Sequence, residues 1–366
     1  MPASCLTFVM HLPARLKHYS FFDIGECAVY EDEVRTFEVL DRAATELYLP
    51  AIQSWQQSLR AFGNDFRFAL ALSGILIEQC ERFRPDVLKG LRKLAENEGV
   101  EFLNMPCHHS LASAISPQEF REQVVLHATQ LRQLTGRIPT AFRNTGLIYS
   151  DALALEVETL GLQVIQAGAE RLLTASQSPH QVYHPAPCAP SMRLLAVAGF
   201  RQEDGFPVAS RGPVTSVSLA LDPDHPPDGE TRWPEFLEKI PGLVLSGGKG
   251  QFVTPTQAAA LCKPAASITS QGACSSVKPY DLSPWRGNEM QKDAMDALYL
   301  LEARVKSLRD PALLRTWRIL QDANQFSLMS TQSRMTSSSS PGAPYDAYIN
   351  FMNILTDFTE RLGGKD

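Results

Sequence analysis

Residues 68–103 read FALALSGILIEQCERFRPDVLKGLRKLAENEGVEFL, with two short apolar runs on either side of a helical pattern. The first run, FALAL (68–72), and the last, VEFL (100–103), have the length and composition of buried strands. Between them, PDVLKGLRKLAENEG (85–99) carries its apolar residues at helical spacing. A strand, a helix and a second strand in this order predict a parallel β-α-β unit.

The same alternation recurs along the first two thirds of the chain. Helical patterns such as PQEFREQVVLHATQLRQLTG (117–136), which ends at a glycine suited to a C-cap, separate further short apolar runs. The candidate strands are residues 5–10, 68–72, 100–103, 140–143, 163–167, 193–198 and 214–221. Seven strands with helices between them predict a β/α barrel or a close variant of it.

After about residue 265 the pattern changes to helices alone. Apolar residues recur at helical spacing in 287–308, in 310–323 and, after the serine-rich loop MTSSSSPGAP, in 345–362. We therefore expect two domains, a β/α barrel over 1–265 and a helical domain over 266–366.

Composition excludes several classes of protein. The net charge is −6, and 34 basic and 40 acidic residues alternate along the chain, so no basic stripe is offered to a phosphate backbone. Nucleic acid is not an expected partner, and no stretch approaches the roughly 18 apolar residues of a membrane span. Seven cysteines without a CxxC pair indicate reduced thiols, and the N-terminus does not read as a signal peptide, so we expect a cytoplasmic protein.

In β/α barrels the active site forms at the carboxyl ends of the strands, and the candidate residues are those that stand there. In strand order they are His11; Gly74 and Glu78; His108 and His109; Arg143, Asn144 and Gly146; and Asp222, Asp224 and His225.

Two chemistries fit these residue types. A metal site would use His and Asp, but His108 and His109 are adjacent and point to opposite faces of a strand, and no HxH or HxxxH pair exists. We therefore expect no metal and no cofactor. Glycoside hydrolysis needs two carboxylates, of which Asp222 supplies one, while the third and fourth strand ends offer no acid.

Several long segments, in order, resemble the α-amylase-type subgroup of glycoside hydrolase family 57. They are MHLPARLKHYSFFDIG, LSGILIEQCERFRPDVL, VEFLNMPCHHSL, FRNTGLIYSDAL, the Asp222 loop, DLSPWRGNEMQKDAMDALYLLEARV and PYDAYINFMNILTDF. The resemblance covers residues 5 to 362 approximately. It implies an incomplete seven-stranded β/α barrel followed by a helical domain, and a retaining mechanism on α-glucans without a metal.

The resemblance also assigns the catalytic positions. In the family the segment FRNTGLIY reads FRNTELIY, and its glutamate is the nucleophile, so Gly146 stands where the nucleophile is lost. A glycine there is expected to widen the pocket. Asp222 falls at the position of the family's acid/base and is the candidate for that role.

Other polar and aromatic groups of the family's motifs are also replaced. Leu12, Met105, Cys107, His108, Ser275, Val277, Gln325, Ser327 and Leu328 stand where the family has residues that would touch a glucan. The candidate substrate-binding residues that remain are His11, Glu78, His109, Arg143 and Trp285. For His11 the alternative is a hydrogen-bonded core histidine, and for Glu78 it is a carboxylate at the start of a helix.

The resemblance implies that Arg143 would have held the carboxylate of the nucleophile, which is missing at Gly146. Arg143 is then expected to pair with Asp222 or Glu78, or to bind an anionic ligand. Two other acids are candidates to replace the missing carboxylate. Asp151 is more typical of a charge in the first turn of a helix, and the sequence does not show which face of its strand Glu101 occupies.

These observations lead to two hypotheses. The first is a catalytically degenerate α-amylase-like protein of carbohydrate metabolism, a pseudoenzyme that binds α-glucan or maltooligosaccharide or has a regulatory role. The alternative is an active retaining hydrolase or transferase with a relocated nucleophile and Asp222 as acid/base. A scaffold protein without a sugar ligand is a third possibility, and the sequence leaves the oligomeric state open.

Overall fold

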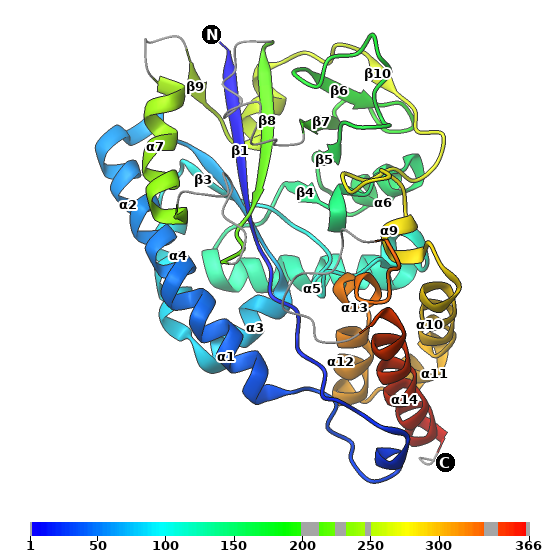
Figure 1. Cartoon of the computed structure of the whole chain (residues 1–366). Coiled ribbons are helices and arrows are strands. Elements are labelled where there is room, and N and C mark those ends of the chain that lie inside the picture. Colours follow the sequence, from blue (N-terminus) through cyan, green and yellow to red (C-terminus); the bar gives the residue numbers. More distant parts are fainter. Residues whose placement is uncertain (1, 199–211, 224–231, 246–249, 333–342, 364–366) are drawn as a thin grey trace.

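A computed structural model describes residues 2–198, 212–223, 232–245, 250–332 and 343–363 (Figure 1). All seven predicted strands are present: β1 (Ala3–Met10), β2 (Phe68–Leu72), β3 (Val100–Phe102), β4 (Ala141–Arg143), β5 (Val164–Gly168), β7 (Arg193–Ala198) and β8 (Val214–Ala220). They are parallel, and neighbouring strands follow the order β3-β2-β1-β8-β7-β5-β4. The predicted barrel-type fold is confirmed.

Three short strands were not predicted. β6 (Val182–Pro185) lies antiparallel to β7, β9 (Gln251–Phe252) pairs with β1, and β10 (Ser267–Ile268) pairs with β6. Two to four residues are too few to show a strand period, so local sequence gives no signal for them. Since β10 still pairs with the sheet, the domain boundary near residue 265 stays a prediction.

In the described part of the chain the strand ladders do not close the barrel. β3 and β4 are joined by a single bridge between Asn104 and Phe142. Behind this bridge, the imidazole of His127 on α5 (Pro117–Thr135) is buried. Its Nε2 donates to the Leu72 carbonyl at 2.8 Å, and its Nδ1 accepts from the Met105 amide at 3.1 Å. His127 therefore ties α5 to the end of β2 and to the loop after β3.

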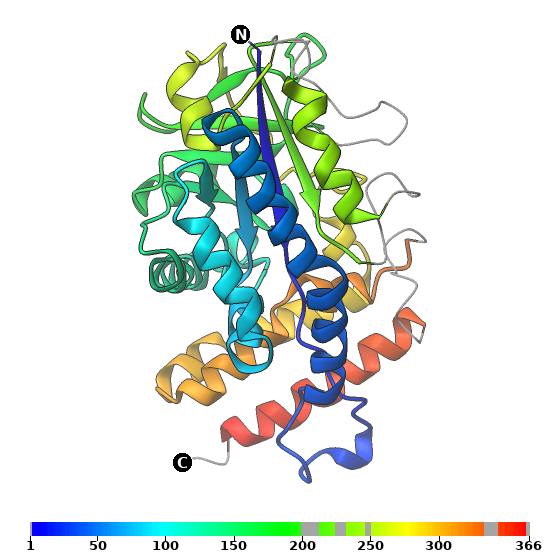
Figure 2. The same ribbon diagram turned by 90° about the vertical axis from the view of Figure 1, so that its left-hand side faces the viewer.

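Helices cover the outside of the sheet. α1 (Glu33–Ala43), α2 (Leu49–Phe62), α3 (Gly74–Phe83), α4 (Pro85–Ala95) and α7 (Trp233–Leu245) pack on one side, α5 and α6 (Asp151–Thr159) on the other. Figure 2 shows α2, α4 and α7 side by side over the strands. α8 (Pro255–Leu261) packs near the amino-terminal ends of the strands. No helix in the described ranges is both long and apolar enough to cross a membrane.

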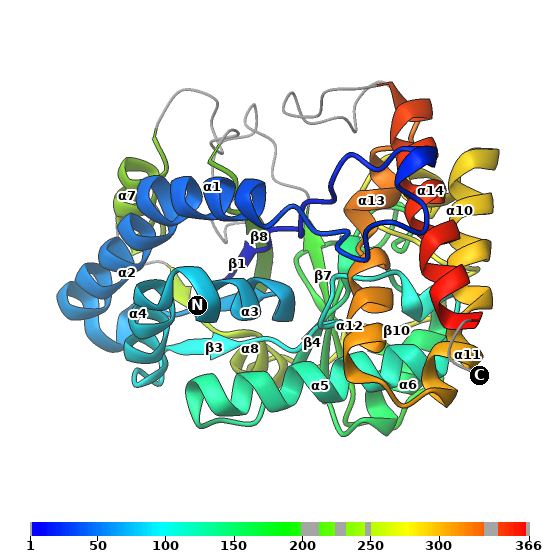
Figure 3. The same ribbon diagram turned by 90° about the horizontal axis from the view of Figure 1, so that it is seen from below.

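In the described residues after 282 the regular elements are helices, as the sequence predicts. They are α9 (Ser283–Arg286), α10 (Glu289–Leu300), α11 (Glu302–Ser307), α12 (Pro311–Leu320), α13 (Ala323–Ser327) and α14 (Pro344–Gly363). The single helix expected over 287–308 is divided at Leu301 into α10 and α11. In the view from below, α12, α13 and α14 stand beside the carboxyl ends of the strands (Figure 3).

A buried ion network holds α12 against α5. The Arg318 guanidinium donates to both carboxylate oxygens of Glu119, at 2.7 and 3.2 Å, and Lys306 approaches the same carboxylate at 2.9 Å. Glu119 has no exposed surface, so its charge depends on these two cations.

The N-terminal loop after β1 is tied to α14. Tyr30 donates its hydroxyl proton to Asp357 at 2.5 Å, the Gly25 amide donates to the same carboxylate at 2.6 Å, and the Tyr19 amide donates to Asn350 at 2.6 Å. The first and last described elements are thereby joined.

Replacing His127 with leucine tests the hydrogen bonds that tie α5 to the end of β2 and to the loop after β3. The variant leaves the Leu72 carbonyl buried without its donor, at about 1–3 kcal/mol, whereas the Met105 amide keeps Asn104 Oδ1 at 2.9 Å. We expect the free energy of unfolding in urea to fall by roughly 1–3 kcal/mol. The exposed His18, replaced by leucine, is the control, and equal losses in the two variants would contradict the assignment.

Candidate active site

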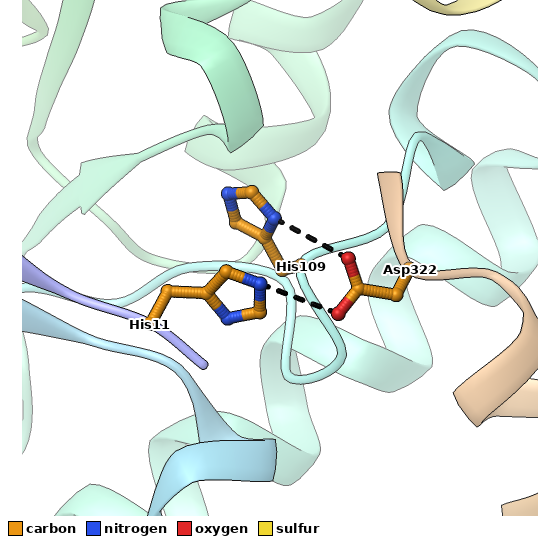
Figure 4. A group of neighbouring side chains, drawn as sticks. All are labelled: His11, His109 and Asp322. Atoms are coloured by element: carbon orange, nitrogen blue, oxygen red, sulfur yellow. Dashed lines mark ion pairs between the residues drawn. The ribbon is translucent and has the colours of Figure 1, made fainter. Parts of the chain in front are cut away.

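The structure brings His11, His109 and Asp322 together at the carboxyl end of the barrel (Figure 4). His11 directly follows β1, His109 lies in the loop after β3, and Asp322 comes from the turn between α12 and α13. His11 Nε2 is 3.3 Å from Asp322 Oδ2, and His109 Nδ1 is 3.8 Å from Asp322 Oδ1. The two imidazole rings stack, with centroids 3.9 Å apart.

Neighbouring groups fix the orientation of all three side chains. Ser73 Oγ lies 2.9 Å from His11 Nδ1, and the Asn324 amide nitrogen lies 2.8 Å from His11 Nε2 and 3.1 Å from Asp322 Oδ1. Asp322 also caps α13, because its Oδ1 accepts from the Asn324 backbone amide. The His109 carbonyl accepts from the Ala323 amide at 3.1 Å, which joins this loop to α13.

Burial sets the protonation of these groups. It lowers the pKa of His109 to about 4, with a further contribution from His11, and the pKa of the adjacent, buried His108 to about 3. For Asp322, burial opposes ionisation, but His11 and His109 outweigh it and hold its pKa well below the usual range. At neutral pH the cluster therefore contains an ionised carboxylate and a neutral His109.

The same three side chains are ligand types that zinc or iron accepts, and their donor atoms lie within 4.8 Å of one another. The sequence did not predict a metal site, because that expectation rested on the spacing of histidines that are close together in the chain. In the geometry present, the rings stack at an interplanar angle of 27°, so their nitrogens stand side by side rather than converging. The Asn324 amide group also faces His11 Nε2. The arrangement favours a hydrogen-bonded cluster, and coordination would require both rings and Asn324 to move.

The space beside Gly146, where the resemblance places the nucleophile, is filled. Gly146 follows β4 with φ 58° and ψ 17°, and a Cβ placed on it would lie 2.4 Å from Cη2 of Trp285. Ser276 donates both its amide and its hydroxyl to the Gly146 carbonyl, so the segment before α9 covers the end of β4. The pocket expected to widen at this glycine is instead occupied by an indole, and Trp285 is 5% exposed, in the core.

Among the residues that the structure describes, Arg143, the last residue of β4, has no carboxylate partner. Alternation along the strand places it on the inner face, on the same side as Ala141 in the barrel interior. Its Nη1 is buried without a hydrogen-bond partner, and no described carboxylate pairs with it. Burial lowers its pKa to about 10. The expected pairing with Asp222 or Glu78 is therefore wrong.

Glu78 serves the packing of helices. It accepts from Arg315 of α12 at 2.5 Å, and Arg315 also bonds Glu31.

The two acids that were candidates to replace the missing carboxylate form hydrogen bonds elsewhere. Glu101 bonds the hydroxyl and amide of Thr256 in α8, at the amino-terminal side, and Asp151 accepts from the Ser270 amide.

Asp222 lies just beyond β8, where its carbonyl accepts from the Trp233 indole at 2.7 Å. Burial lowers the pKa of Arg15, and the charges of Asp322 and Asp222 both act against this. Asp224 and His225 lie outside the described residues.

Sequence reasoning missed Asp322, Asn324 and Arg15. All three lie outside the strand ends at which candidates were sought, and Asp322 is distant in the chain from its histidine partners. The sequence signal for Asp322 was that of an N-cap aspartate before a short helix. Such residues are common in helical segments, so the signal does not indicate a functional site.

Comparison with known proteins identifies the family. The profile of glycosyl hydrolase family 57 matches residues 5–198, more than half of the chain. The chain therefore belongs to glycosyl hydrolase family 57, and the resemblance noted in its sequence is confirmed.

Particular relatives agree with this assignment. A protein named "Putative alpha-amylase" from Methanocaldococcus jannaschii is 24% identical over 370 residues, covering 90% of this chain and 78% of that protein. The fold is similar to the family 57 branching enzyme of Pyrococcus horikoshii, with a TM-score of 0.70 at 12% identity over 96% of this chain and 88% of that one. It is also similar to 4-alpha-glucanotransferase of Thermococcus litoralis, with a TM-score of 0.60 at 15% identity. That match covers 89% of this chain but about half (49%) of the transferase.

Gly146→Ala and Gly136→Ala separate backbone strain from the contact with Trp285. Both glycines have positive φ, so each alanine costs about 1–2 kcal/mol, but nothing lies within 4 Å of a Cβ at Gly136. We expect Gly146→Ala to be less stable by a further 1–3 kcal/mol or so, because the indole must move. Thermal or urea unfolding measures this. Combining it with Trp285→Ala should reveal coupling, and additive losses would contradict the contact.

Stability should fall with acid between pH 6.5 and 4. His108, His109 and His127 have folded pKa values lowered to about 3, 4 and 4, so in this window the unfolded chain binds more protons than the folded one. Each should remove roughly 1.4 kcal/mol per pH unit from the free energy of unfolding. Urea titrations at pH 7, 6 and 5 test this, with His108→Gln expected to reduce the slope. A free energy independent of pH over this range would overturn it.

Proposed function

We propose that this family 57 chain is an α-amylase-like protein of α-glucan metabolism that binds a maltooligosaccharide without hydrolysing it at enzyme rates. One observation carries the proposal: the nucleophile position is Gly146, and Trp285 lies where a glutamate side chain would begin. Glycine cannot act as nucleophile or proton donor, and the packing leaves no room for another side chain to take its place.

Loss of hydrolysis leaves a binding or regulatory role. Hydrogen bonds hold His11 in place, His109 stacks on it, and imidazole nitrogens are of the kind that contact sugar hydroxyls. The seven cysteines are free thiols, which supports the cytoplasm as the proposed location.

The test is an incubation of purified protein with maltoheptaose, with chromatographic analysis of products and calorimetric titration of binding. We expect saturable binding and no release of shorter oligosaccharides above the level of heat-treated protein. The Asp222→Asn variant should leave both results unchanged. Hydrolysis at enzyme-like rates that is abolished in Asp222→Asn would falsify the proposal.

A second candidate function is retaining hydrolysis with Asp322 as the relocated nucleophile and Asp222 as acid/base. The favouring observation is that both carboxylates act on the same Arg15 side chain. It would be supported by a glycosyl adduct found by mass spectrometry on the peptide that contains Asp322. Against it stand the cap hydrogen bonds and the two histidines, which already occupy both oxygens of Asp322.

A further inference from the structure

We propose that Arg143 anchors a site for an anionic sugar, an α-glucoside or short maltooligosaccharide that carries a carboxylate or phosphate group. This inference deepens the proposed function and rests on it, because it names the class of ligand that the degenerate site binds. It starts from a positive charge that the described part of the chain leaves without a carboxylate partner.

Other deeply set cations of the described chain face carboxylates. Arg318 pairs with Glu119 and Glu122, Lys306 shares these two acids, and Arg15 lies near Asp222 and Asp322. Buried charges are normally paired in this way, because an isolated ion loses its hydration.

Arg143 departs from this pattern. Its Nη1 is buried and unbonded, and burial is what lowers the pKa of the guanidinium to about 10. Yet the side chain as a whole keeps some exposed surface. A cation that is set deep but is still accessible is positioned to take its counter-ion from a ligand.

The neighbours of Arg143 supply neutral hydrogen-bonding groups. Gln166 stands beside it in register on β5, and its Nε2 donates to Thr7 Oγ1 at 2.8 Å across the barrel. Gln166 Oε1 is buried without a partner, so it is free to accept a hydrogen bond from a ligand hydroxyl. His109 also interacts with Arg143 electrostatically and is neutral at pH 7, because its pKa is lowered to about 4. One guanidinium with neutral partners fits a single anionic group on a polyhydroxylated molecule.

Within the described ranges, no acid supplies the missing charge at the position of Gly146. A side chain at Gly146 would collide with Trp285, and Glu101 and Asp151 bond groups elsewhere. The planar fork of arginine matches a carboxylate or a phosphate through two parallel hydrogen bonds. A carboxylate-bearing sugar would restore the type of group that the resemblance places beside this arginine.

Calorimetric titration tests the inference with matched probes: maltose, maltobionate, maltose 1-phosphate and inorganic phosphate. We expect maltobionate to bind at least tenfold more tightly than maltose, with an affinity that falls as NaCl rises. Tight binding of maltose 1-phosphate as well would identify the shared anionic chemistry, whereas its failure would restrict the site to carboxylates. Maltose binding equal to maltobionate, no binding of either anion, or free phosphate binding as tightly as the sugar phosphate would overturn the proposal.

Two variants assign the effect to Arg143. Arg143→Gln should lose at least tenfold in affinity for maltobionate and keep its affinity for maltose, and Arg143→Lys should recover part of the loss. Thermal unfolding gives an independent readout. Removing an uncompensated charge should leave the ligand-free melting temperature of Arg143→Gln unchanged or higher, while Arg318→Gln, which breaks a paired site, should lower it. A clear fall in Arg143→Gln would indicate a structural role and count against the site.

The outcome is separable from that of the proposed function. Turnover of maltoheptaose would defeat the proposed absence of hydrolysis, whatever the charge preference of the pocket. The ratio of anionic to neutral sugar affinity is measured without turnover, so it decides the role of Arg143 alone.

Discussion

The site depends on the buried contact between Glu119 and Arg318. Arg318 lies in the last turn of α12, and Asp322 follows it at the end of the same helix, so the bidentate bond to α5 determines where Asp322 lies. Gln123 of α5 adds a bond to Gln321 at 2.8 Å. Without this attachment, the two histidines of the barrel would face solvent, and the cluster in Figure 4 would have no carboxylate.

The sequence pattern was sufficient to predict the strands and helices that bury long apolar faces. β1, β2 and β8 are five to eight residues long and bear apolar side chains on both faces, which gives a strong local signal. β9 and β10 contain two residues each, and their pairing is decided by the surrounding chain. For the site, rules about strand ends located His11 and His109, but no local rule links them to Asp322. The packing of Trp285 on Gly146 could not be predicted either, because it is a tertiary contact between segments that lie far apart in the sequence.

Gly146 and Arg143 belong to one physical change. Under the proposed function, glycine in place of a carboxylate removes a reactive group, lets an indole pack against the backbone, and leaves the neighbouring guanidinium without its partner. Trp285 fills the space at Gly146, whereas no acid of the described residues pairs with Arg143. Family 57 membership describes the frame of this protein, and the proposed loss of the nucleophile would set its interior charges apart from those of a retaining glycosidase.

The contact between His11 and Asn324 joins residues 313 positions apart in the chain. At roughly 5 to 20 residues per second, the ribosome needs about 15 to 60 seconds to make the intervening polypeptide. During that interval the first strand and its histidine exist without the turn that will cover them. The tie from Tyr30 to Asp357 also needs the last helix, so assembly of the cluster in Figure 4 and closure of the N-terminal loop are both late events of biosynthesis.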